Sequence, residues 1–148
     1  MYPNAKASEM LAILATIDPA SQAAGAISSG WVSVANHLGF LALVQTGLLG
    51  TAATVDAKLQ QALDATGTGA KDITGRAIIQ IVKANGDNKQ ALINLKPEDL
   101  DTVNGFGFVR VTVTVGVAAS ITAAQLLGVN PRYAPADVGN QAAVVQVI

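Results

Sequence analysis

The chain has 148 residues, no cysteine and a formal net charge of −1, and 13% of its residues are charged. This length fits one domain, with or without arms, and the lack of cysteine excludes disulfide bonds and thiolate metal sites. Ordinary globular domains contain about 25% charged residues. Because no basic cluster is present, the sequence does not predict binding to nucleic acid.

Residues 1–26 are rich in alanine and contain Pro3 and Pro19, without a clear helical or strand period. Residues 8–14 could form one or two helical turns. We expect the whole segment to be an extended arm that becomes ordered on a partner, because it cannot bury its own apolar side chains.

From residue 31 onward the sequence alternates as β-strands do. The clearest case is the run of Val109, Val111, Val113 and Val115, because a two-residue period puts successive side chains on opposite faces of a sheet. The predicted strands cover residues 31–34, 40–48, 54–65, 76–84, 90–95, 106–117 and 120–129.

Glycine-rich or polar segments separate these strands. Asn85-Gly86 is typical of a tight hairpin turn, since both residues tolerate positive φ, and it predicts that strand 90–95 pairs with strand 76–84. Residues 67–69 predict a flexible loop, and residues 96–100 predict a loop or a single helical turn.

Seven or eight short strands at this spacing are typical of a sandwich or jelly roll. We therefore predict an all-β protein with a jelly-roll-like antiparallel β-sandwich over residues 27–130. An N-terminal arm at 1–26 and a C-terminal arm at 131–148 would extend from it.

Two long runs, residues 19–55 and 111–131, carry no formal charge. Neither is typical of a membrane span, because the first has only a short apolar core and the second alternates threonine with valine. Charge is depleted at the cores of protein interfaces, so we expect other chains to cover part of the surface. The alternative is a small soluble domain whose faces are polar but uncharged.

The sequence offers no catalytic constellation. His37 is the single histidine, and we expect it to be a packed or surface residue and not a metal ligand. Glu98, Asp99 and Asp101 lack the spacing of an EF-hand and predict a solvated loop. No nucleophile elbow and no phosphate-binding glycine loop is present. We therefore predict that the protein is not an enzyme and binds no cofactor.

Pro131 and Pro135 flank an arginine and a tyrosine, which are residue types enriched at interface hot spots. This segment is either an anchor for a partner or a rigid turn that closes the domain. The apolar residues 142–148 predict a second arm or an edge strand that is added to a neighbouring chain. The predicted interface residues are Tyr2, Leu11, Leu14, Trp31, Arg132, Tyr133, Val145 and Ile148.

Several phrases of the sequence resemble a known family. They are ATIDP at 15–19, SQAAG at 21–25, GWV at 30–32, ATVDAKLQQA at 53–62, GTGAKDI at 67–73, NKQALINL at 88–95, FVR at 108–110 and NPRY at 130–133. They resemble the small structural proteins that are encoded near the major capsid gene of tailed bacteriophages and are described as head decoration or cement proteins.

The resemblance covers most of the chain. It implies a jelly-roll-like sandwich on the outer surface of the capsid, where dimers or trimers bind the major capsid protein and help the head resist the pressure of packaged DNA. The phrases lie in predicted strands and loops, and the family shares no ligand motif, so no binding residue is carried over.

Two other functions remain open. A tail-tube or head–tail joining protein would form rings instead of covering a lattice. A small-ligand or carbohydrate-binding β-sandwich would need a pocket with aromatic and polar groups, which one tryptophan, two tyrosines and three phenylalanines supply poorly.

Overall fold

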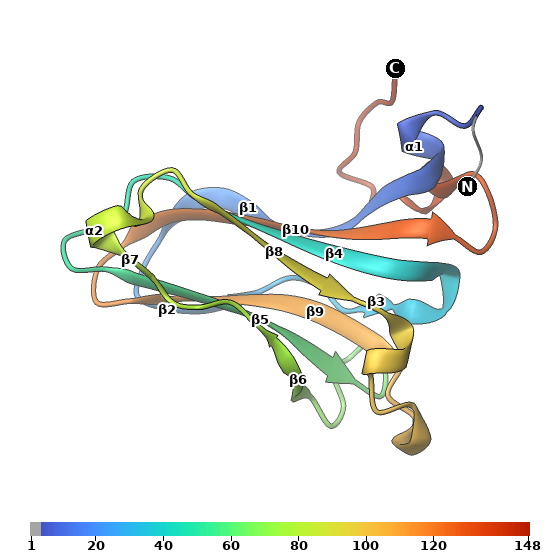
Figure 1. Ribbon diagram of the computed structural model, residues 1–148, viewed down its shortest axis with the longest axis horizontal. Coiled ribbons are helices and arrows are strands. Elements are labelled where there is room, and N and C mark those ends of the chain that lie inside the picture. Colours follow the sequence, from blue (N-terminus) through green and yellow to red (C-terminus); the bar gives the residue numbers. More distant parts are fainter. Residues whose placement is uncertain (1–3) are drawn as a thin grey trace.

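The computed structural model describes residues 4–148 and contains two antiparallel β-sheets packed face to face (Figure 1). In spatial order, sheet A consists of β1 (Leu11–Gln22), β10 (Ser120–Pro131), β4 (His37–Thr46) and β8 (Gln90–Leu95). In spatial order, sheet B consists of β2 (Gly25–Ser28), β9 (Phe108–Gly116), β5 (Thr54–Ala62) and β6 (Lys71–Ala77). Two short strands complete sheet B: β3 (Val32–Ser33) pairs with β9, and β7 (Ile81–Val82) pairs with β5.

The strand pairing is nested. β1 pairs with β10, β2 with β9, β4 with β8, and β5 with β6. The first and second halves of the chain thus fold back on each other like one long hairpin, which is then wrapped into two sheets. This connectivity is that of a jelly roll, and it confirms the prediction of an all-β, jelly-roll-like antiparallel sandwich.

The alternating sequence places the core between the sheets. On β9, Val109, Val111, Val113 and Val115 are at most 1% exposed, and Leu59 of β5 is fully buried. Sheet A contributes Phe40, Ala42, Val44, Ala124 and Leu126 to the same cluster. Full burial of such an aliphatic side chain is worth about 1.5–3 kcal/mol, so the inner faces hold the two sheets together.

Strand β8 does not pair with the segment before it, and the hairpin predicted from residues 85–86 is wrong. These residues belong to a short helix, α2 (Lys83–Gly86), and β8 pairs with β4 instead. Gly86 is buried, and a Cβ there would lie 2.8 Å from a methyl group of Leu49. This glycine therefore allows close packing. The side chain of Asp87 fixes the same turn by accepting a hydrogen bond from the backbone N–H of Leu49 at 2.9 Å.

The N-terminal segment is also different from the expected arm. Within residues 4–26, a short helix α1 (Ala7–Met10) leads into β1, which pairs with β10 along most of its length. Ala12, Ala15 and Ile17 are at most 6% exposed, so β1 buries apolar side chains in the sandwich. Two register shifts interrupt its alternation, as β-bulges do, and this hid the strand from the sequence pattern.

The other elements are short. The predicted strand 76–84 is divided between the end of β6, the separate strand β7 and α2. The helical turn expected at 96–100 is confirmed as the 3₁₀ turn η2 (Pro97–Asp99). The remaining 3₁₀ turns in residues 4–148 are η1 (Val34–Asn36), η3 (Thr102–Asn104) and η4 (Ala136–Gly139).

After η4 the chain docks against the outer edge of β1. The backbone N–H of Ile13 donates to Oδ1 of Asn140 at 2.7 Å, and the backbone N–H of Gln141 donates to the carbonyl of Ile13 at 2.8 Å. Residues 142–148 then continue without strand or helix. In Figure 1 the C-terminal end and α1 lie at the same end of the molecule.

Candidate interaction surfaces

The outer side of sheet A is uncharged across three of its four strands and partly apolar. Its strands β10, β4 and β8 contain no Asp, Glu, Lys or Arg, and β1 contains a single charged residue, Asp18. Leu92 is 60% exposed and Ile121 is 42% exposed. We define the uncharged face by its outward side chains: Leu41, Leu43, Gln45, Gln90, Leu92, Asn94, Ile121, Ala123 and Gln125.

The uncharged face has the composition of a surface that another protein can cover. Its centre is a shallow depression of about 30 Å³, lined mainly by Leu43, Gln45, Ala123 and Gln125. Covering leucine and alanine removes apolar area from water, and a glutamine amide costs far less to desolvate than an ion. Interface cores are likewise depleted of charge.

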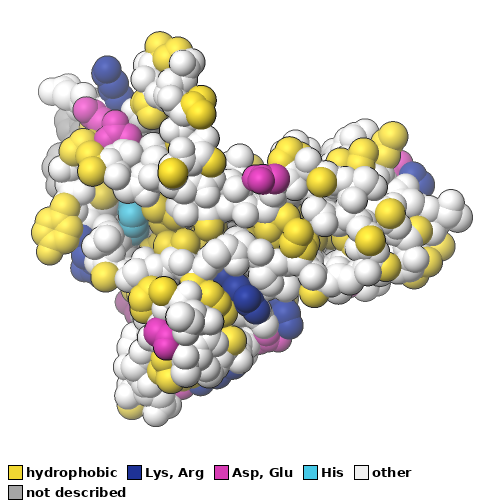
Figure 2. Space-filling model, turned by 180° about the vertical axis from the view of Figure 1, so that it is seen from behind, with side chains coloured by type: hydrophobic (Ala, Val, Ile, Leu, Met, Phe, Trp, Pro, Cys, Tyr) yellow, Lys and Arg dark blue, Asp and Glu magenta, His cyan; other side chains and the backbone are white. Residues whose placement is uncertain are grey.

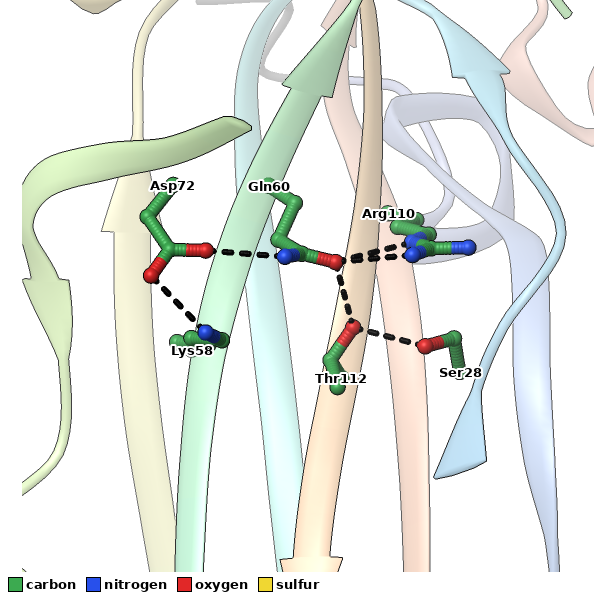
Figure 3. A network of polar contacts seen from close by, with 6 residues as sticks. All are labelled: Ser28, Lys58, Gln60, Asp72, Arg110 and Thr112. Carbon is green, nitrogen blue, oxygen red and sulfur yellow. Dashed lines mark hydrogen bonds and ion pairs between the residues drawn. The ribbon is translucent and has the colours of Figure 1, made fainter. Parts of the chain in front are cut away.

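The outer side of sheet B carries an ordered polar network, which Figure 3 shows from close by. Gln60 of β5 lies at its centre. Its Nε2 donates to Asp72 at 2.8 Å, and its Oε1 accepts from Nε and Nη2 of Arg110 at 3.0 and 2.9 Å. The same oxygen accepts from the hydroxyl of Thr112 at 3.0 Å, and Thr112 lies 2.7 Å from the hydroxyl of Ser28.

Several charged side chains on sheet B form ion pairs. Nζ of Lys58 lies 2.8 Å from a carboxylate oxygen of Asp72, and Arg76 lies 2.8 Å from Asp99. The hydrogen bond from Lys58, and then the one from Gln60, holds the pKa of Asp72 below its ordinary value. Figure 2 shows charged side chains as a few small groups on a surface that is mostly uncharged. Sheet B thus has the character of a solvent-facing surface.

Trp31 belongs to the sheet B surface. The guanidinium carbon of Arg110 lies 4.5 Å from the centre of its ring, as in a cation–π contact. On the loop after β5, Gly67 has φ +87°, and a Cβ there would lie 2.5 Å from Nε1 of the indole. The tryptophan is therefore packed between Arg110 and this loop and is half-buried.

A hollow of about 380 Å³ lies at one end of the sandwich, between the start of β1 and η4. Leu14, Val32, His37, Tyr133 and Ala136 are among the residues that line it. Figure 2 shows the single histidine in cyan among apolar side chains in this region.

His37 is 5% exposed and makes an edge-on contact with the ring of Phe40, with 5.8 Å between the ring centres. Within residues 4–148 its Nε2 is buried without a hydrogen-bond partner. Burial lowers the pKa of the imidazole. These features fit the expectation that His37 is a packed residue.

The predicted interface residues near the termini come together only in part. Leu14 and Tyr133 both line the end hollow, and Tyr133 is 79% exposed. The neighbouring Arg132 is exposed, and its backbone N–H donates to the carbonyl of Asn36 at 2.9 Å. Leu11 begins β1 and is half-buried, and Tyr2 lies outside the described residues.

The other predicted residues lie elsewhere. Val145 is 92% exposed and Ile148 is fully exposed, both in the C-terminal segment, whereas Trp31 lies on sheet B. The uncharged face was not singled out from the sequence. The signal in the sequence was the absence of charge in residues 90–95 and 120–125, which does not tell which strands share a sheet.

Neither a metal centre nor a membrane-spanning helix was found in the part of the chain that the structure describes. In residues 4–148, no group of three or more His, Asp or Glu side chains is arranged to hold a metal ion. No helix among these residues is long and apolar enough to cross a membrane.

No family model and no curated protein matches the chain. Among solved structures it is similar to a CBM4 structure, with 14% identity and a TM-score of 0.41 over 78% of this chain and 67% of the other. It is also similar to CBM28, a carbohydrate-binding module specific for non-crystalline cellulose, with 11% identity and a TM-score of 0.42 over 73% and 67% of the two chains. A third similar structure is that of infectious bursal disease virus Gt strain, with 7% identity and a TM-score of 0.43 over 85% of this chain and 33% of that one.

The chain is a β-sandwich of the jelly-roll type. Because the identities and TM-scores are low, we infer no ligand, partner or assembly of this chain from the three similar structures.

Proposed function

We propose that the protein is a virion structural protein, namely a capsid decoration or cement protein. It binds the outer surface of a major capsid protein lattice through the uncharged face and stabilises the head. The observation that carries this proposal is the absence of charge across β10, β4 and β8, whereas sheet B carries charged side chains, several of them in ion pairs. The resemblance of the sequence to head decoration proteins of tailed phages also supports it.

Burial provides the binding energy in this proposal. A standard protein–protein contact covers about 800 Å² on each partner, and a sheet face of leucine, alanine and glutamine can contribute to such a contact without desolvating an ion. Repeated contacts on a symmetric shell add avidity when neighbouring copies also touch each other. Sheet B, with its ion pairs, then remains toward the solvent.

Electron cryo-microscopy of tailed-phage particles made with and without the gene for this chain tests the assignment. The expected result is density for a β-sandwich on the outside of the head, present only with the gene, with sheet A toward the shell. Density in the tail, or no difference between the particles, overturns the assignment to the head.

A pair of matched variants tests which face binds. Gln45→Glu combined with Gln125→Glu adds charge to the uncharged face with little change in shape, and we expect it to lower the occupancy on purified heads at least tenfold. Thr74→Glu adds charge to the exposed side of β6 and should leave the occupancy unchanged. Equal occupancy for both variants contradicts attachment through sheet A.

A role as a tail-tube or head–tail joining protein is the first alternative. It predicts ring-shaped particles of the purified protein, which negative-stain electron microscopy would detect. A lattice-covering protein gives no closed rings of uniform diameter under the same conditions.

Carbohydrate binding is the second alternative, and the observation in its favour is Trp31 beside a row of polar groups. The contacts there are already occupied, because Arg110 covers the indole and Gln60 is bonded through both ends of its amide. A glycan array probed with purified protein tests it, with Trp31→Ala as the control. Specific glycan binding by the natural chain that is lost in Trp31→Ala would favour a carbohydrate-binding function.

A further inference from the structure

The free edges of the two sheets are unequally protected. β1 carries Asp18 and Pro19, has two register shifts and is partly covered by Asn140 and Gln141. β6 carries charged residues, and β2, β3 and β7 have four, two and two residues. Charges, prolines, bulges and shortness are the usual means by which proteins prevent another strand from adding to an edge.

β8 has none of these features. It is the outermost strand of sheet A, and no strand of residues 4–148 pairs with its other side. Residues 90–95 contain no proline, glycine or charged side chain. Leu92, near its middle, is 60% exposed. An uncharged and uncovered edge of six residues accepts another strand readily.

The hydrogen-bond pattern gives the groups that are available on β8. The backbone N–H of Thr46 donates to the carbonyl of Lys89 at 2.8 Å, so these two opposite residues form a hydrogen-bonded pair of the antiparallel ladder. Because bonded and non-bonded pairs alternate in an antiparallel ladder, the register directs the N–H and C=O groups of Gln90, Leu92 and Asn94 away from β4.

The C-terminal residues 142–148 have the composition of a β-strand but pair with no strand of either sheet in residues 4–148. Their sequence, AAVVQVI, is uncharged and rich in β-branched residues, which favour extended backbone. Val145 is 92% exposed, and Ile148 is fully exposed. Within the described chain, the backbone hydrogen bond of this segment is that from the N–H of Val144 to the carbonyl of Gln141 at 3.0 Å.

Residues 142–148 cannot pair along β8 of their own chain. They leave from Gln141, which is bonded to Ile13 on β1 at the opposite edge of sheet A. Crossing β10 and β4 takes about three strand spacings, or about 14 Å, and β8 is about 20 Å long. Seven extended residues reach at most about 25 Å, so too few would remain to form a ladder.

We propose that residues 142–148 of one copy add as an extra strand to the free edge of β8 in a second copy. The segment and the edge are of similar length, and the side chains of both are uncharged. Each has backbone N–H and C=O groups that can pair with those of the other. The new strand satisfies the outward backbone groups of β8 and covers the exposed side chain of Leu92. The contact joins two different surfaces, so it links copies head to tail, and it does not depend on attachment to a capsid.

Disulfide trapping tests this contact directly, since the natural chain has no cysteine. One chain carries Leu92→Cys, and partner chains carry a single cysteine at one position from 143 to 147. We expect mixed, oxidised samples to give covalent dimers at alternate positions of the scan, because side chains of a strand alternate between faces. Ala123→Cys, on a strand away from the edge, is the control and should give none.

Other outcomes overturn the proposal. Cross-linking of the Leu92→Cys chain with itself, but with no tail position, would show pairing of two β8 edges instead. No cross-linking at any position, in a sample that associates, would show that another surface holds the copies together. Either result leaves the capsid proposal standing, because density on the head does not require this contact.

Removal of residues 142–148 gives a second measurement. Sedimentation equilibrium of the full chain should show association that weakens at least tenfold in the shortened chain, while the far-ultraviolet spectrum of the sandwich stays the same. An unchanged association constant contradicts the proposal.

Discussion

The two outer faces of the sandwich differ although their inner faces are alike. Both sheets turn valine, leucine and isoleucine toward a shared core. On the outside, the polar residues of sheet B form a hydrogen-bonded network around Gln60, whereas three neighbouring strands of sheet A carry no charged residue. The inner pattern specifies the fold, and the outer pattern distinguishes a face with ordered polar contacts from a face without charge.

The largest expected effect tests the part that the two sheets share. Leu59→Ala on β5 and Leu126→Ala on β10 each remove a side chain that is fully buried. Each should lower the free energy of unfolding by about 2–5 kcal/mol, because a cavity remains where the methyl groups were. Urea titration measures this. A large loss for one variant and almost none for the other would show that the core is not shared equally.

A smaller effect separates the outer faces. Gln60→Ala removes the acceptor for Arg110 and Thr112 and should lower the free energy of unfolding by about 1–2 kcal/mol. Gln45→Ala, on the uncharged face, removes an exposed amide and should change it by less than about 0.5 kcal/mol. Equal losses in urea titrations would remove the distinction between an ordered and an unordered face.

The pH dependence of stability should come from the paired carboxylates. Asp72 has a pKa that is lower in the folded protein than in the unfolded chain, so its contribution is present above about pH 4 and is lost as the pH falls through the folded value. Asp72→Asn should therefore be less stable than the natural chain at pH 6, by about 0.2–1 kcal/mol for an exposed pair. The gap should close in thermal unfolding as the pH falls below the folded pKa of Asp72. A constant gap would mean that the ion pair is not its cause.

The smallest effect on stability is expected for charges added to the uncharged face. Gln45→Glu with Gln125→Glu places two exposed carboxylates on the outer side of sheet A. The isolated protein should unfold within about 0.5 kcal/mol of the natural chain, even though we propose that its occupancy on heads falls at least tenfold. A strongly destabilised variant would mean that the face supports the fold and is not only a contact surface.

The local elements could be predicted from the sequence where one strand has one buried side. Residues 54–62 and 108–116 alternate cleanly, and the strand at 90–95 begins and ends as expected. Which strand pairs with which was harder to predict from the sequence. The hairpin signal at residues 85–86 favoured pairing with the preceding segment, but β8 pairs with a strand more than forty residues earlier.

The interaction surfaces were harder to predict for the same reason. Leu14 and Tyr133 were singled out separately, and only the fold places them in one hollow. The uncharged face combines three strands from distant parts of the chain, so no short window contains it. Exposed leucines such as Leu92 look like core residues until the sheet order is known.

The nested pairing also bears on synthesis. β1 leaves the ribosome first, but its partner β10 begins only at Ser120. At about 5–20 residues per second, β1 waits for roughly 5–20 s with its apolar side chains uncovered. A nascent chain of this design therefore depends on a chaperone, or on its own solubility, until the last strand, β10, has been made.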